Sequence, residues 1–257
     1  MGKIRINKPH SISEDKAQVL RYGENPHQKG VFFGDFDALF TKLHGKELSY
    51  NNIVDMEAAW NMVWEFTEPA ACIIKHTNPC GAATAATLHD AYVNAYEADS
   101  VSAFGGIVAL NREVDASTAE EMSKIFLEVI MAPAFTKEAL EILEAKKNIR
   151  LIELSKPESG QVTVKKVSGG LLVQTEDDIL EDRANYKVVT KVQPTEEQWK
   201  ALEFAWKLVK HVKSNAILIS NEKRTLGVGA GQMNRVGSAK IALEQAGEAA
   251  KGAVLAS

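Results

Sequence analysis

Residues capable of acid–base chemistry cluster in one short segment, Lys75-His76-Thr77-Asn78-Pro79-Cys80-Gly81. The segment follows residues 70–74, a short apolar run typical of a buried strand. Polar groups at the end of such a strand face the ligand crevice of an open α/β sheet. A lysine beside a histidine favours the neutral imidazole by charge repulsion, which makes His76 a usable base near pH 7. A solvated lysine and a histidine satisfied within a turn explain this pair equally well.

A glycine-rich segment at residues 226–235 has the layout of an anion-binding loop. It reads Leu-Gly-Val-Gly-Ala-Gly-Gln-Met-Asn-Arg and lies between a predicted strand and a predicted helix. Backbone N–H groups and the helix N-terminus would face an anion, and Arg235 can add a bidentate phosphate contact. The Gly-x-Gly-x-Gly spacing differs from the dinucleotide motif, and the Walker lysine is absent. A tight turn without a ligand is an equally good interpretation.

Two further segments carry residues of interest. Lys207 and His211 lie one turn apart on a predicted helix, so they share a face. Asn215 opens the strand after that helix, where a buried amide needs partners and can orient a ligand or the histidine. Phe104 precedes two glycines, which allow the backbone to approach a flat ligand closely. A packed turn explains the Phe104 segment as well.

The spacing of His76 and Cys80 invites a zinc interpretation. The zinc deaminases require His-x-Glu and Pro-Cys-x-x-Cys. In this sequence Asn78 replaces the glutamate and Ala83 replaces the second cysteine. We therefore expect no catalytic metal.

Composition excludes several classes of protein. The 257 residues include 30 Lys and Arg against 34 Asp and Glu, a formal charge of −4 that argues against a dedicated nucleic-acid binder. Two cysteines cannot form a disulfide framework. No apolar run reaches about 18 residues and the start lacks an apolar signal core, so we expect no membrane span and a cytoplasmic protein.

Strands alternate with helices of about ten residues along much of the chain, which predicts an α/β fold with a mainly parallel sheet covered on both faces. We expect a helix over residues 55–66 capped by Asp55, one over 117–126 opened by a Ser117/Glu120 capping box, and one over 196–210 capped by Thr195. The predicted organisation is a leader arm at 1–19, a first α/β unit at 20–155, a connecting segment at 156–193 and a second unit at 194–257.

Six segments in order resemble the transformylase region of the AICAR transformylase/IMP cyclohydrolase family. They are residues 20–28, 45–52, 75–81, 102–106, 213–216 and 227–235. The resemblance implies two cytidine-deaminase-like three-layer α/β/α units, the second incomplete. It also implies transfer of a formyl group from the co-substrate 10-formyltetrahydrofolate to the 5-amino group of AICAR, which gives FAICAR in purine biosynthesis.

The resemblance also implies roles for individual residues. His76 would shuttle the proton, Lys75 would stabilise the oxyanion, and Asn215 would orient the imidazole or the formyl oxygen. The remaining matched positions are Arg21, Tyr22, Asn52, Glu128 and Arg235 for the nucleotide, with Arg235 on the phosphate, and Phe104 and Val236 for the folate.

The family has a cyclohydrolase domain before these motifs and a further segment after a stretch like residues 254–257. We therefore expect a fragment that folds, binds AICAR weakly and turns over little by itself. A non-catalytic purine-nucleotide-binding remnant is the alternative. The family's sites lie at a homodimer interface, so the resemblance implies a homodimer.

Overall fold

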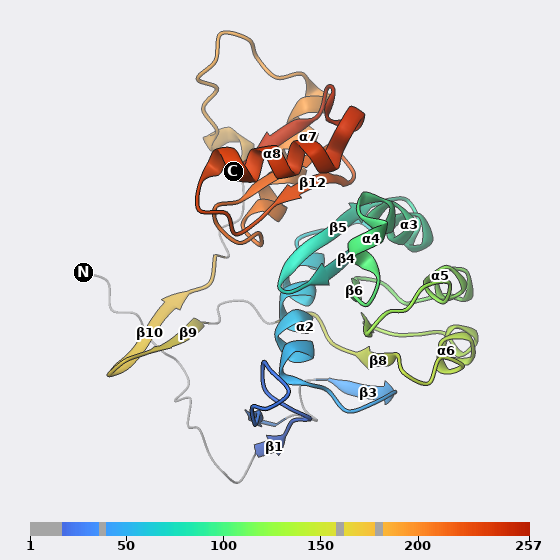
Figure 1. Cartoon of the computed structure of the whole chain (residues 1–257). Coiled ribbons are helices and arrows are strands. Elements are labelled where there is room, and N and C mark those ends of the chain that lie inside the picture. Colours follow the sequence, from blue (N-terminus) through green and yellow to red (C-terminus); the bar gives the residue numbers. More distant parts are fainter. Residues whose placement is uncertain (1–16, 36–39, 158–161, 178–181) are drawn as a thin grey trace.

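The computed structural model describes residues 17–35, 40–157, 162–177 and 182–257 (Figure 1). Most of the expected leader arm lies outside these ranges. Its last residues form strand β1 (Ala17–Val19), which pairs antiparallel with β2 (Val31–Phe33). The loop between the two strands contains no helix or strand.

The main sheet has six strands in the order β3-β8-β7-β6-β4-β5. Their bounds are β3 Thr41–His44, β4 Ala70–Lys75, β5 Asn78–Thr84, β6 Ile107–Leu110, β7 Val129–Ala132 and β8 Arg150–Glu153. Only β6, β7 and β8 are parallel to one another. Strand β4 is antiparallel to both of its neighbours, and β3 is antiparallel to β8. The prediction of a mainly parallel sheet is therefore wrong.

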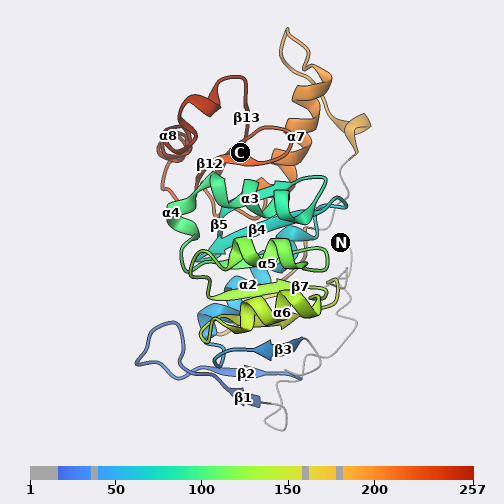
Figure 2. The same ribbon diagram turned by 90° about the vertical axis from the view of Figure 1, so that its right-hand side faces the viewer.

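Helices cover both faces of this sheet, which confirms the α/β class (Figure 1). Helix α2 (Tyr50–Val63) packs on one face against Ile74 and Met131. Alternate strand residues such as Ile73 and Ile130 face the other side. There they pack under α3 (Leu88–Ala98), α5 (Ala116–Met122) and α6 (Lys137–Glu144), which lie side by side in Figure 2. A four-residue helix, α4 (Ser100–Ala103), precedes β6.

A smaller antiparallel sheet, β12-β11-β13, adjoins β5 (Figure 1). The part of the chain that contains this sheet comprises α7 Glu196–Val209, β11 Ile217–Ser220, β12 Thr225–Gly229, α8 Arg235–Ala246, η3 Gly247–Ala250 and β13 Val254–Ala256. An antiparallel bridge joins Ala83 of β5 to Arg224, and the Ala82 amide donates to Thr225 Oγ1 over 3.0 Å. The apolar cluster under α2 includes Phe204 and Leu208 of α7, so one core continues across the predicted boundary between units.

The connecting segment contains a hairpin that projects from the body of the molecule (Figure 1). Its strands β9 (Val162–Val167) and β10 (Gly170–Thr175) pair antiparallel, and both are largely exposed. A single 3₁₀ turn, η2 (Arg183–Asn185), follows before α7.

One of the three predicted helix caps is confirmed, and two are wrong. Thr195 and Gln198 form the predicted capping box of α7. The predicted Ser117/Glu120 box is wrong, because Asp115 caps α5 by accepting from the Thr118 amide. The Asp55 cap is also wrong. Ser49 caps α2 in a capping box with Asn52, six residues before the predicted cap, and Asp55 lies within the helix.

An ionic cluster joins the end of α2 to the end of α7. Glu65 Oε1 lies 2.7 Å from Lys210 Nζ and 2.8 Å from His211 Nε2. Burial by itself would raise the pKa of Glu65, but the hydrogen bonds and charges of its two partners lower that pKa below its usual value. The positive charge at the end of α7 is thus partly neutralised by Glu65.

Within the ranges that the structure describes, no helix combines the length and the apolar character needed to cross a membrane.

Candidate functional site

The predicted acid–base segment forms a hairpin turn between β4 and β5. Lys75 pairs with Asn78, which leaves His76 and Thr77 as the two residues of the loop. Both have positive φ, 52° and 63°, as a two-residue hairpin turn with two left-handed residues requires. The Asp55 carboxylate accepts from the amides of both, at 3.2 Å from His76 N and 2.7 Å from Thr77 N. His76 is exposed at the tip of this turn.

Lys75 and Asn78 connect the turn to neighbouring segments. Lys75 Nζ donates to the carbonyl of Phe104 over 2.8 Å, which fixes the ammonium beside the segment that precedes β6. Asn78 Nδ2 donates to the His76 carbonyl over 3.0 Å, and Asn78 Oδ1 accepts from the Lys213 amide over 3.0 Å. The side chain of Asn78 therefore links the His76 turn to the segment that enters β11.

Asn215 lies in that entering segment. Its side-chain Nδ2 donates to the Gln232 carbonyl over 2.8 Å, and its own carbonyl accepts from Ser238 Oγ over 2.6 Å. These bonds hold Asn215 between the glycine-rich loop and α8. The His76 carbonyl is thus bonded to Asn78, and Asn78 is bonded to the Lys213 amide, two residues before Asn215. These bonds bring two of the predicted catalytic residues, His76 and Asn215, into one assembly, here called the His76 assembly.

The glycine-rich segment divides into two parts with different roles. A Cβ on Gly227 would lie 2.0 Å from the Ala242 carbonyl oxygen, and one on Gly229 would lie 1.9 Å from that of Ser238. These two glycines therefore let β12 pack directly on the backbone of α8. Only Gly231, with φ +66°, serves the turn itself.

Helix α8 begins with an exposed arginine. Asn234 caps it by accepting from the Gly237 amide over 2.7 Å, and Arg235 is the first residue of the helix. The Arg235 side chain is exposed, and none of the side-chain hydrogen bonds or ion pairs found among the described residues involves it. Its charge thus adds to the positive end of the helix dipole, an arrangement suited to an anion. Val236 beside it is 66% exposed.

Phe104 and Glu128 lie beside the amino ends of parallel strands. Phe104 is 59% exposed and packs at a tilt on Phe126, with ring centroids 5.7 Å apart. Glu128 precedes β7, and its Oε2 lies 2.7 Å from Nη1 of the buried Arg150. Arg150 also donates to the carbonyl of Glu47 over 3.1 and 3.2 Å. The sequence analysis missed Arg150, because nothing local marks an arginine as the ion-pair partner of a residue that lies 22 positions away.

The remaining predicted residues lie where the β1–β2 loop meets the start of α2. The Arg21 guanidinium lies over the ring of Tyr22, 5.4 Å from its centroid. The Tyr22 carbonyl accepts from the Tyr50 amide over 3.3 Å. Asn52 is buried, and its side-chain oxygen accepts from Ser49 N in the capping box of α2. None of the hydrogen bonds of the described residues joins Arg21, Tyr22 or Asn52 to the His76 assembly.

The His76 turn lies at the amino ends of the parallel strands, whereas the sequence predicts it at their carboxyl ends. Ile74 pairs with Ile107, so the carboxyl end of β4 lies beside the amino end of β6. His76 therefore shares an edge with the residues that precede the parallel strands, namely Phe104 and Glu128. The expected crevice at the carboxyl ends of a parallel sheet is wrong for β6, β7 and β8, because β4 runs against them.

The described residues contain no group of three or more His, Cys, Asp or Glu side chains that could hold a metal ion. Cys80 is buried, and this burial, with the nearby negative charge of Asp99, raises its pKa to about 12. A thiol must lose its proton to bind zinc, so this environment opposes the role of Cys80 as a ligand.

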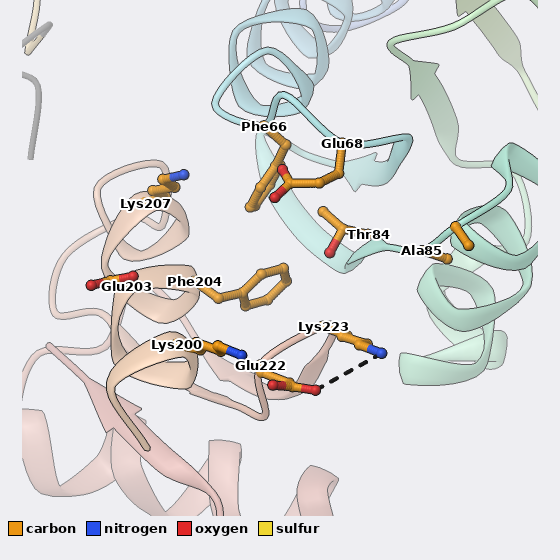
Figure 3. Close-up of a pocket in the computed structure, with 11 residues that line it drawn as sticks. Phe66, Glu68, Thr84, Ala85, Lys200, Glu203, Phe204, Lys207, Glu222 and Lys223 are labelled. Atoms are coloured by element: carbon orange, nitrogen blue, oxygen red, sulfur yellow. Dashed lines mark ion pairs between the residues drawn. The ribbon is translucent and has the colours of Figure 1, made fainter. Parts of the chain in front are cut away.

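A hollow of about 590 Å³ lies at the end of β4 and β5 that is remote from the His76 turn, where β5 ends near α7 (Figure 3). Phe66 and Phe204 stack there with ring centroids 5.1 Å apart. The charged residues that line it are three lysines and three glutamates: Lys200, Lys207, Lys223, Glu68, Glu203 and Glu222. None of the residues predicted for the site lines this hollow, and its charges balance.

The structure is thus that of an α/β protein in which the exposed His76 turn is hydrogen-bonded to the segment that precedes β11, beside the glycine-rich loop and the start of α8. The model of the AICARFT/IMPCHase bienzyme family matches residues 3–245, so the chain belongs to this family and the resemblance is confirmed.

Three relatives are each named bifunctional purine biosynthesis protein PurH. Those of Listeria monocytogenes serotype 4a (strain HCC23) and Listeria welshimeri serovar 6b are 58% and 60% identical over 256 residues. That of Bacillus cereus (strain AH187) is 55% identical over 255 residues. Each match covers 96% of this chain and 50% of the relative, so the chain spans about half the length of these curated relatives.

Proposed function

We propose that this chain carries the formyl-transfer site of a purine biosynthesis enzyme. The reaction moves a formyl group from 10-formyltetrahydrofolate to the 5-amino group of AICAR and gives FAICAR. One observation carries the proposal: the exposed His76 turn is hydrogen-bonded through Asn78 to the segment that holds Asn215, beside the start of α8. Membership of the family and the PurH names of the relatives support it.

The chemistry requires a group that both takes and returns a proton. The amine of AICAR is aromatic and conjugated with a carboxamide, so it is a weak nucleophile that must lose a proton as it attacks. The departing N10 of the folate must gain one. An imidazole between them does both, and such general acid–base catalysis contributes typically about 10²–10⁴ in rate. His76 is the group that we place there.

Lys75 and Asn215 would serve the formyl oxygen. Negative charge develops on that oxygen in the tetrahedral intermediate, and fixed donors stabilise such charge. The Lys75 ammonium, held at the Phe104 carbonyl, and the Asn215 amide, held at Gln232, are both fixed before substrate arrives.

The substrate contacts are those that the resemblance implies, and the charge and exposure of the side chains support them. Arg235 and the start of α8 would hold the phosphate. Glu128 would accept from the carboxamide N–H groups, with Arg150 fixing its carboxylate. The exposed side chains of Phe104 and Val236 would cover the pterin ring. Arg21, Tyr22 and Asn52 would belong to the nucleotide region, and the homodimer implied by the resemblance is testable by sedimentation velocity.

The test is substitution of His76 by alanine. We expect kcat for formyl transfer to fall by at least about 10²-fold while the calorimetric Kd for AICAR changes by less than about tenfold. His89→Ala is the matched control, because His89 is a surface histidine on α3 whose only polar partner among the described residues is Asp90. Because the chain spans half of its relatives, both variants are measured in this chain and in a form extended with the remaining residues of the Listeria protein.

Retention of more than a few per cent of kcat in His76→Ala would exclude His76 from proton transfer. AICAR binding without turnover in both unsubstituted forms would favour the alternative, a non-catalytic purine-nucleotide-binding module.

A further inference from the structure

The hairpin turn that presents His76 has an unfavourable backbone conformation. Two-residue loops with both residues left-handed favour sequences such as Asn-Gly, because a Cβ is crowded at positive φ. Here the two positions are His76 and Thr77, and Thr77 is β-branched. Such a conformation at a bulky residue persists only where surrounding contacts determine it.

Thr77 Oγ1 and Asn78 Nδ2 both donate to the His76 carbonyl, over 2.7 and 3.0 Å, whereas the contacts to the two loop amides come from Asp55. The two oxygens of this one carboxylate accept separately from the two amides of the loop, over 3.2 and 2.7 Å. A carboxylate suits this task, because both of its oxygens accept and neither donates. The position of Asp55 is also fixed by the packing of its helix. It lies within α2, and the next residue, Met56, is buried in the main core with Ala59 and Trp60.

We infer that Asp55 is a positioning residue for His76: it holds the strained turn and thereby fixes where the imidazole lies. The inference rests on the proposed function for its catalytic consequence. Without the carboxylate the loop would relax towards negative φ, which would displace the His76 side chain. Displacement of a catalytic group by about 1 Å can cost about 10² in rate.

The experiment compares Asp55→Ala and Asp55→Asn with the unsubstituted protein. Amide hydrogen exchange of His76 and Thr77, measured by NMR, reports the two hydrogen bonds without any need for activity. In Asp55→Ala we expect both amides to exchange at least about tenfold faster. In Asp55→Asn only one oxygen remains, so one amide keeps its protection. If the alanine variant does not fold, the isosteric asparagine variant carries the comparison.

Activity provides the second readout. For Asp55→Ala we expect kcat to fall by about 10–10²-fold while the Kd for AICAR stays within about threefold, since ground-state binding does not depend on the turn. Adding Thr77→Gly should recover about tenfold in kcat, because glycine adopts positive φ freely. Asp115→Asn is the matched control: Asp115 also accepts from a backbone amide, but at the start of α5.

Unchanged exchange at both amides in Asp55→Ala would overturn the inference, and so would a loss of kcat that Thr77→Gly does not relieve. A lack of AICAR binding and turnover in the unsubstituted protein would refute the proposed function instead. The amide measurement still decides the positioning role in that case.

Discussion

Replacing Gly229 with alanine should push α8 away from β12. An added Cβ would lie 1.9 Å from the Ser238 carbonyl oxygen, which is 1.5 Å short of the 3.4 Å at which ordinary contact begins. The neighbouring atom belongs to the helix backbone, so no side-chain rotation relieves the clash. The strand and the helix must separate by an amount of that order.

The cost follows from overpacking of a well-packed core, typically about 1–3 kcal/mol and occasionally more. For a domain of 150–250 residues each kcal/mol lowers Tm by about 2–4 °C. The displacement also moves the start of α8, so the proposed role of Arg235 predicts that AICAR binds more weakly. Gly227→Ala should behave in the same way, because its Cβ would lie 2.0 Å from the Ala242 carbonyl oxygen.

The assay is urea denaturation followed by circular dichroism, with calorimetric titration of AICAR. Gly170→Ala is the matched control, because nothing lies within 4 Å of the Cβ that it would add. We expect that control to stay within about 0.5 kcal/mol of the unsubstituted protein. If Gly229→Ala is equally stable, then the close approach of β12 and α8 is not what requires glycine there, and the assignment of this glycine to packing fails.

Three other outcomes follow from the described contacts. Glu65→Gln should lower the free energy of unfolding by about 1–3 kcal/mol at pH 7. Because the pKa of Glu65 is lowered in the folded state, this difference should shrink as the pH falls below the unfolded value of 4.5; urea titrations at pH 7 and pH 4 that show equal differences would contradict it. Arg150→Met should destabilise by about 1–3 kcal/mol, since it leaves Glu128 without its partner, and it should weaken AICAR binding in calorimetry if Glu128 contacts the carboxamide. Burial raises the pKa of the thiols of Cys72 and Cys80, so neither should react with a disulfide reagent at pH 8 until urea unfolds the chain, and stoichiometric labelling of the native protein within minutes would refute this.

The elements that the sequence predicts well are those with local signals. Thr195 caps α7 as predicted, and α3 begins after a cap of the same kind, Thr87. Thr136 caps α6 in the same way. In each case a cap residue precedes an apolar pattern of helical period, so everything that the interpretation needs lies within about 15 residues.

Asp55 shows why some site residues escape this reasoning. As an aspartate before an apolar helical pattern, it resembles an N-cap, and Ser49 with Asn52 lacks the usual Glu or Gln of a capping box. The amides that Asp55 accepts from are 21 and 22 residues away in the sequence. Only the fold brings them to the carboxylate, so no local pattern indicates the contact.

The direction of β4 decides where the proposed site lies. The sequence analysis placed that site at the wrong end of the parallel strands, and the residues that cause this error are the same two that strain the turn. A two-residue loop of His76 and Thr77 carries none of the Asn or Gly signals by which a hairpin is predicted, so residues 75–81 resemble an irregular strand end. The chain instead reverses there into β5, and β4 lies antiparallel to β6. That reversal brings His76 to the amino ends of the parallel strands, near Phe104 and Glu128 rather than across the sheet from them. The unfavourable residues of the turn are therefore the ones that the proposed chemistry needs, and Asp55 compensates for them from α2.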